Sequence, residues 1–122
     1  MTNLILPDSN VYIGAVRAGI EDRELEFATC GMVMLEVCRG LRDPGLLKRF
    51  RERFAVMIFL PTTNQIWERA NQLAWSLDRQ GMVIPATDVI IAACALHAGA
   101  AVLTADAHFQ AVPGLDVLES LD

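Results

Sequence analysis

The sequence predicts an α/β protein with one parallel sheet of about five strands, flanked by helices on both faces. A chain of 122 residues is long enough for one hydrophobic core and too short for two, so one domain is expected over residues 1–122. Apolar residues make up 53% of the chain, which suits a sheet covered on both faces. Short apolar runs alternate with helical patterns throughout, as crossover connections between parallel strands require.

The first expected elements are a strand, a helix and a second strand. Residues 3–7 form an apolar strand that ends at Pro7, because proline cannot donate a hydrogen bond within a central ladder. A helix is expected over residues 11–17 and is closed by Gly19. An acidic turn then leads into a strand near residues 26–29.

Three helices and a strand make up the middle of the chain. The helices are expected at residues 31–41, 46–54 and 63–80, and the strand at residues 56–60. The break Asp43-Pro44-Gly45 separates the first two helices, and apolar residues at helical spacing give the second and third a buried stripe. Trp75 lies half a turn from the stripe of the third helix, as an isolated surface residue or as part of a partner surface.

The segment from Pro85 to Phe109 is the most apolar part of the chain. Thr87 is expected to cap a helix whose residues 89–96 are apolar on every side, which predicts a buried helix, and Gly99 closes it. A buried strand over residues 101–104, a helical turn over 106–112 and a last strand over 115–118 follow.

Charge and cysteine content narrow the class of protein. A net charge of -5 argues against a surface coated with basic residues for nucleic acid. Cys30, Cys38 and Cys94 lack a CxxC spacing, as is typical of core thiols in a reducing compartment. No segment reaches the length of a membrane span and no leader is apparent, so a cytoplasmic protein is expected. Most of the basic residues nevertheless fall in one run: Arg39, Arg42, Lys48, Arg49, Arg51 and Arg53.

Four acids stand where the local pattern is apolar or where a strand ends: Asp8, Glu36, Asp88 and Asp106. Taken singly, the three aspartates have ordinary explanations as a turn residue, a helix-dipole partner and a helix cap. Glu36 lies among apolar residues in mid-helix, where a carboxylate is rare unless it is paired or bound to metal. Asp8 and Asp106 follow parallel strands, and the other two lie on helices that start from the same sheet edge. All four are therefore expected to meet there.

Carboxylates this close together repel one another unless a cation neutralises them. Mg²⁺ or Mn²⁺ fits such oxygen ligands, whereas zinc does not, since neither Cys nor His joins the set at ligand spacing. The site suits hydrolysis of phosphodiester bonds, because one metal ion activates water and a second, if present, neutralises the leaving oxygen. Asn10 and Thr104 are expected to orient carboxylates or water, unless they are local turn residues.

The motifs LPDSNVYI, MLEVCRG, PATDVIIAACAL and VLTADAHF, then VPGLDVL, occur in this order along the chain. In this order and spacing they resemble the PIN-domain ribonucleases, and within them the small bacterial VapC-like toxins. The resemblance covers essentially the whole chain. It implies Mg²⁺- or Mn²⁺-dependent endonucleolytic cleavage of RNA, a homodimer, and inhibition by a cognate antitoxin. It also places the catalytic and metal-binding acids at Asp8, Glu36, Asp88 and Asp106, with Asn10 and Thr104 in supporting positions.

The chain departs from the family pattern at His108, where many relatives have a further Asp. This departure puts a five-carboxylate site and a second metal ion in doubt. His108 is either a surface cap or a proton donor to the leaving oxygen, since histidine titrates near neutral pH. Pro7 also replaces the residue usual before the first acid, and it is expected only to shift the last hydrogen bond of the strand.

The basic run begins one helical turn after Glu36, so Arg39 and Arg42 are expected to bind RNA phosphates at the rim of the acidic site. The alternative is a solvated helix face. An enzyme that transfers phosphoryl groups through Asp8 as nucleophile needs a lysine late in the chain. The only lysine is Lys48, which argues against this alternative. A catalytically inactive PIN-like module that binds RNA or protein is the remaining alternative, and the four acids weigh against it.

Overall fold

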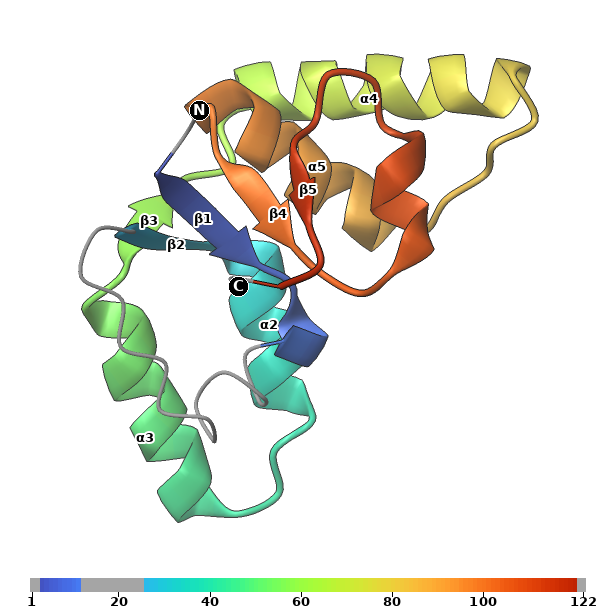
Figure 1. The fold of residues 1–122 in the computed structure, drawn as a ribbon. Helices are drawn as coiled ribbons and strands as arrows, with labels where there is room; N and C mark the ends of the chain where they lie inside the picture. The colour runs from blue at the N-terminus through green and yellow to red at the C-terminus, as the bar shows by residue number, and fades with distance from the viewer. Residues whose placement is uncertain (1–2, 12–25, 121–122) are drawn as a thin grey trace.

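A computed structural model describes residues 3–11 and 26–120 of the protein. Within these ranges the chain forms a five-stranded sheet in which every pairing is parallel, in the order β3-β2-β1-β4-β5. The strands are β1 (Leu4–Pro7), β2 (Glu26–Cys30), β3 (Ile58–Leu60), β4 (Ala101–Leu103) and β5 (Val117–Leu118). The helices are α2 (Gly31–Arg39), α3 (Pro44–Ala55), α4 (Asn64–Arg79), α5 (Ala86–Ala98) and the 3-10 helix η1 (Ala107–Ala111) (Figure 1).

The parallel α/β fold expected from the sequence is confirmed. Every expected strand is present, although β3 and β5 each begin two residues later than the apolar runs indicated. The helix expected over residues 11–17 lies almost wholly outside the described residues. Among the described helices, none is long and apolar enough to cross a membrane.

The helix starts show how local chemistry sets the boundaries. Asp43 caps α3, because its Oδ1 accepts a hydrogen bond from the backbone N of Gly45 at 3.1 Å, and α3 therefore begins at Pro44. The expectation that Thr87 caps α5 was wrong. Pro85 takes the cap position with extended backbone angles, φ -58° and ψ 143°, so Thr87 lies inside the first turn.

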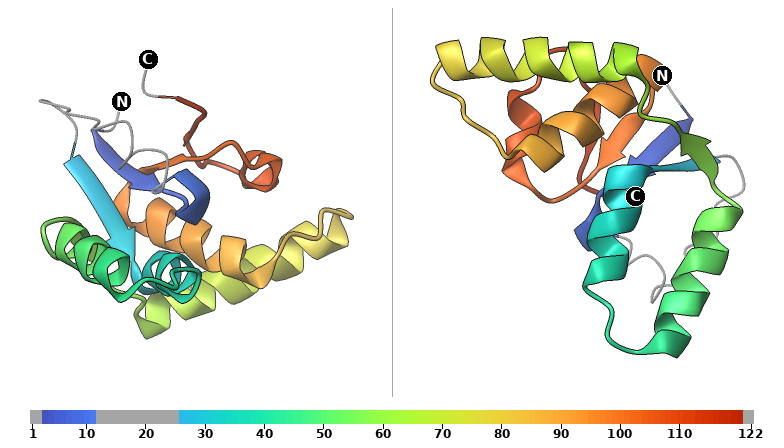
Figure 2. Two further views of the ribbon diagram at one scale, coloured as in Figure 1. Left: turned by 90° about the horizontal axis from the view of Figure 1, so that it is seen from below. Right: turned by 180° about the vertical axis from the view of Figure 1, so that it is seen from behind.

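Both faces of the sheet carry apolar side chains, because successive residues of a strand point in opposite directions. Leu6 and Val102 face the larger core, whereas Ile5, Ala101 and Leu103 face the other side. Helix α5 lies in the larger core, between the sheet and α4 (Figure 2). Its burial is continuous over residues 88–95, as the run without a polar face predicts, and it ends at Gly99 in the left-handed conformation with φ 68°.

The sheet has a topological switch point between β1 and β4. From the central strand β1 the chain moves outward to β2 and β3 on one side, and β4 and β5 lie on the other. The carboxyl ends of β1 and β4 are adjacent, since Pro7 pairs with Leu103. Ligands of open parallel sheets bind at such a point, so the residues that follow these two strands decide what the protein can hold.

Candidate metal and catalytic site

Asp8 and Asp106 follow β1 and β4 at the switch point. The backbone N of Asp8 donates to Leu103 O at 2.9 Å, which extends the β1–β4 pairing by one residue. Thr104 Oγ1 donates to Asp8 Oδ2 at 3.1 Å and accepts a hydrogen bond from the backbone N of Asp106 at 2.9 Å. The backbone N of Ser9 donates to Asp8 Oδ1 at 2.7 Å. One buried hydroxyl thus joins the two acid-bearing segments, and both carboxylate oxygens of Asp8 have fixed donors.

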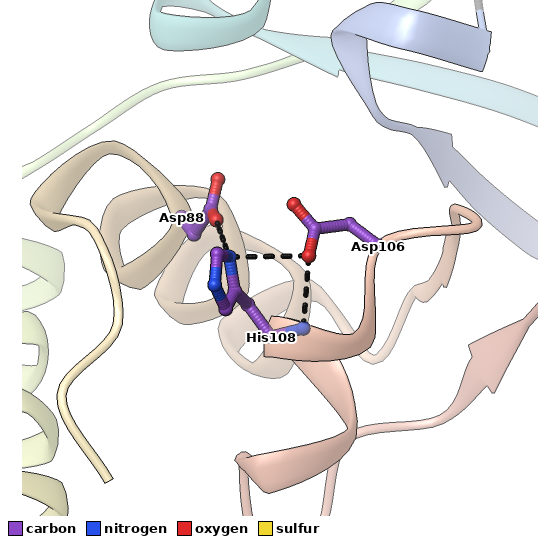
Figure 3. Close-up of side chains that lie close together, drawn as sticks. All are labelled: Asp88, Asp106 and His108. Atoms are coloured by element: carbon purple, nitrogen blue, oxygen red, sulfur yellow. Dashed lines mark hydrogen bonds and ion pairs between the residues drawn. The ribbon is translucent and has the colours of Figure 1, made fainter.

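Asp88 lies in the first turn of α5 and points toward η1, where it meets His108 (Figure 3). His108 Nδ1 lies 3.2 Å from Asp88 Oδ2 and 3.1 Å from Asp106 Oδ1. The backbone N of His108 also donates to Asp106 Oδ1 at 2.9 Å, so Asp106 caps η1. Asp88, Asp106 and His108 can each offer a ligand atom, and these three atoms all lie within 4.8 Å of one another.

Glu36 adds a fourth carboxylate from α2. Burial raises the pKa of Glu36, the charges of Asp8 and Asp88 raise it further, and Arg39 lowers it. Burial likewise raises the pKa of Asp88, with a partly offsetting hydrogen bond from His108 and further increases from Asp106 and Asp8. The charges of Asp8 and Asp88 act on Glu36, and those of Asp106 and Asp8 act on Asp88, so the four acids lie in one neighbourhood.

The four acids predicted from the sequence lie near one another, and Asp88 and Asp106 are the two whose oxygens lie closest to a shared point. Asp106 caps η1, which confirms one of its two sequence interpretations, and its role as a metal ligand stays a prediction. Arg39 and Arg42 are both exposed, and Arg39 is close enough to Glu36 to lower its pKa. Asn10 is exposed beside the end of β1, and its supporting role stays a prediction.

The sequence singled out His108 without its contacts, and it did not single out Ser9. The expectation that no histidine joins the acids at ligand spacing was wrong, because η1 turns His108 back toward α5 instead of leaving it as a simple surface cap. Its side chain is 47% exposed and still contacts both aspartates. No local rule signals Ser9, because its backbone N donates to the residue directly before it, whereas an Asx turn joins an aspartate to the backbone two residues further on.

A divalent cation fits this donor set. Glu36 Oε1 is buried and has no hydrogen-bond partner among the described residues. A buried carboxylate oxygen without a partner is unfavourable, and the raised pKa values of Glu36 and Asp88 report the same uncompensated negative charge. Carboxylate oxygens are the ligands that Mg²⁺ and Mn²⁺ prefer, so a bound cation would remove both penalties.

A sequence model of the PIN domain matches residues 5–115, a range that includes all four acids. The chain belongs to the PIN domain family. This PIN domain is similar in fold to a chain of VapBC2 from Rickettsia felis, whose structure contains a DNA fragment from the promoter. That match has a TM-score of 0.78 and 16% identity, and it covers 93% of this chain and 96% of that chain.

A chain of VapBC-5 from Mycobacterium tuberculosis, a toxin-antitoxin protein, also matches this PIN domain. The TM-score is 0.75 and the identity 22%, with 98% of this chain and 100% of that chain covered. VapBC-1 from nontypeable Haemophilus influenzae matches with a TM-score of 0.75 and 20% identity, over 93% of this chain and 96% of that chain. At these identities the likeness shows a common fold. The comparison with curated proteins gave no match.

Two buried threonines of this PIN domain are expected to respond oppositely to substitution by valine. Thr104→Val should lower the free energy of unfolding by about 1–3 kcal/mol, because Asp8 Oδ2 and the backbone N of Asp106 both lose their partner. Thr29→Val should be neutral or stabilising, since Thr29 Oγ1 is buried with no partner among the described residues. Urea unfolding of both variants measures the difference, and equal losses would contradict the proposed role of the Thr104 hydroxyl.

Glu36 and Asp88 are expected to contribute less to the stability of the metal-free PIN domain as the pH rises above about 4, the ordinary pKa of a carboxyl group. Because the pKa values of Glu36 and Asp88 are raised in the folded state, that state binds more protons than the unfolded state in this range. The two carboxyl groups favour the folded state at low pH, and this contribution is lost as the pH rises through their raised pKa values. In EDTA, the double variant Glu36→Gln/Asp88→Asn should melt at a higher temperature than the wild type, and the difference should grow with pH. A difference that stays constant with pH would contradict the role of these two groups.

Proposed function

We propose that this PIN domain is a divalent-metal-dependent endoribonuclease that hydrolyses phosphodiester bonds in RNA. The observation that carries the proposal is the convergence of four carboxylates at the switch point of the sheet, with Glu36 Oε1 lacking a hydrogen-bond partner among the described residues. A structural role does not call for four like charges at one place, since their mutual repulsion disfavours the folded state. Membership of the PIN domain family supports the same conclusion.

In this proposal Asp8, Glu36, Asp88 and Asp106 hold Mg²⁺ or Mn²⁺. When bound, the ion supplies activation of water and neutralisation of charge on the leaving oxygen. Thr104 fixes the Asp8 carboxylate through the hydrogen bond to Oδ2, and the β1–β4 pairing fixes the backbone on both sides of it. Asp8 and Asp88 are only 3% and 8% exposed, so few water molecules compete with their carboxylate oxygens for the ion.

The positive charges near the site are the proposed contacts for the RNA backbone. Arg39 and Arg42 are exposed on and just after the last turn of α2, the helix that carries Glu36. Arg39 already lowers the pKa of Glu36, so its charge acts on the site. Phosphates that bind at this rim would lie beside the four acids.

We further propose that the protein is the toxin of a toxin-antitoxin pair and forms a homodimer. The support is the fold that it has in common with chains from VapBC structures. Trp75 on α4 is 60% exposed and stacks with Arg79 at 5.0 Å, which leaves a large apolar side chain open to a second subunit or to an antitoxin. A small protein with an acidic segment that co-purifies with this chain would support the pairing, and a cytoplasmic location stays a prediction.

Incubation of the purified protein with a structured RNA tests the proposed activity. With Mn²⁺ or Mg²⁺ the RNA should be cut at internal positions, and EDTA should stop the cleavage. A fluorescent label at each end separates internal cuts from digestion that starts at an end. RNA that is bound and left intact with both metal ions would refute the nuclease.

That last result would instead favour the second candidate, a catalytically inactive module that binds RNA or protein. This second candidate is supported by His108, which contacts Asp88 and Asp106 and so provides both carboxylates with a partner without an ion. The two candidates predict different effects of metal ions on RNA binding. A nuclease needs the ion near the acids, whereas a binding module keeps its affinity in EDTA.

A further inference from the structure

His108 offers the site something that its carboxylates do not, a nitrogen ligand. Its Nδ1 lies 3.2 Å from Asp88 Oδ2 and 3.1 Å from Asp106 Oδ1, with the three side chains turned toward one another (Figure 3). We propose that His108 Nδ1 is a metal ligand, and that it shifts the preference of the site from Mg²⁺ toward Mn²⁺ or another first-row transition-metal ion. This inference rests on the proposed function only for the use of the ion, not for its binding.

The distances fit ligands that share one ion. Neighbouring ligand atoms around an octahedral ion with bonds of about 2.1 Å lie about 3 Å apart. Both contacts of His108 Nδ1 have this length, and the ligand atoms of the three residues lie within 4.8 Å of one another. The ring therefore needs no large movement to exchange its hydrogen bonds to the two aspartates for a bond to metal.

The type of ligand atom decides for which metal ion the affinity of the site increases. Mg²⁺ binds oxygen ligands and gives up its water reluctantly, whereas imidazole nitrogen suits transition-metal ions, whose affinity rises from Mn²⁺ toward Cu²⁺. A set with one imidazole and several carboxylates should still bind Mg²⁺ through its oxygens. It should gain affinity for a transition-metal ion through the nitrogen.

The position of His108 is set by its neighbours and not by the ion. Its backbone N donates to Asp106 Oδ1 at 2.9 Å, and the next residue, Phe109, is fully buried. Both interactions hold η1 in place, so the ring faces Asp88 before any metal binds. A ligand that is already positioned loses less conformational freedom on binding, which makes its contribution to affinity larger.

Metal binding by the stripped protein tests the proposal directly. Mn²⁺ bound to the wild type should show nitrogen coupling in pulsed electron paramagnetic resonance, and this signal should vanish in His108→Asp. The same substitution should lower the ratio of Mn²⁺ to Mg²⁺ affinity by about tenfold or more, measured by calorimetric titration. His97→Asp is the matched control, because His97 is exposed in the last turn of α5, and it should leave both the signal and the ratio unchanged.

The wild-type signal keeps the test decisive even if His108→Asp folds poorly. Bound Mn²⁺ without nitrogen coupling, or a nitrogen signal lost only in His97→Asp, would overturn the assignment. Nitrogen-coupled Mn²⁺ in a protein that leaves RNA intact would support the ligand and refute the proposed nuclease. Metal-dependent RNA cleavage without nitrogen coupling would support the proposed nuclease and refute His108 as a ligand.

Discussion

Asp88→Asn is expected to lower the rate of metal-dependent RNA cleavage by about a thousandfold, equivalent to about 4 kcal/mol of transition-state stabilisation. The substitution keeps the shape of the side chain and removes one of four charges around the proposed ion. The same change should raise the melting temperature of the metal-free protein. Burial and the nearby acids raise the pKa of Asp88, which shows that its negative charge is unfavourable in the fold without metal. Cleavage of an end-labelled RNA and thermal unfolding in EDTA measure the two effects.

Opposite effects on activity and stability separate a functional acid from a structural one. If Asp88 served only to hold α5 against η1 through His108, its loss would lower stability and leave the cleavage rate of the folded protein unchanged. Glu68→Gln is a suitable control, because Glu68 is an exposed acid on α4 and should alter neither quantity. Full cleavage activity in Asp88→Asn would refute the mechanism in which the four acids hold the ion.

The proximity of the acids could be predicted, because local rules place Asp8, Asp106 and Glu36. Asp8 and Asp106 stand directly after buried strands, and parallel strands bring their carboxyl ends to one edge. Glu36 stood out because a carboxylate among apolar residues needs a partner. Chain order alone then places these acids near one another, without knowledge of any side-chain contact.

His108 could not be placed by such a rule. Its contact with Asp88 depends on how tightly η1 turns after Asp106 and on how deeply the following residue enters the core. Those are properties of packing between segments distant in sequence. The prediction that Thr87 caps α5 was wrong for a related reason. A good capping residue does not fix the start of a helix when Pro85 already provides the extended backbone before it.

Periodicity likewise identified apolar helix faces but not how much of each face is covered. On α3, Phe50 and Phe54 are buried as the stripe predicted, whereas Leu46 on the same stripe is 41% exposed. The apolar stripe runs along the length of α3, but neighbouring elements cover only the part that holds Phe50 and Phe54. Which end of a stripe is buried depends on tertiary packing and does not follow from the spacing of residues.

Phe109→Ala is expected to have the largest effect on stability, a loss of about 3–5 kcal/mol from a total that is about 5–15 kcal/mol for a domain of this kind. Phe109 is 0% exposed and anchors η1 in the larger core. Its removal leaves a cavity and releases the segment that carries Asp106 and His108. Urea unfolding measures the loss. Phe59→Ala on the edge strand β3 is the matched control, because Phe59 is 54% exposed and its removal leaves no cavity.

The same pair of variants tests how the core supports the site. If Phe109 fixes η1, the folded fraction of Phe109→Ala should bind Mn²⁺ more weakly than the wild type, because Asp106 and His108 lose their fixed position opposite Asp88. Phe59→Ala should bind the ion with wild-type affinity. Wild-type affinity in both variants would mean that the cap formed by Asp106 holds η1 in place without the aromatic anchor. In that case the geometry of the site would depend on local hydrogen bonds and not on the core beneath it.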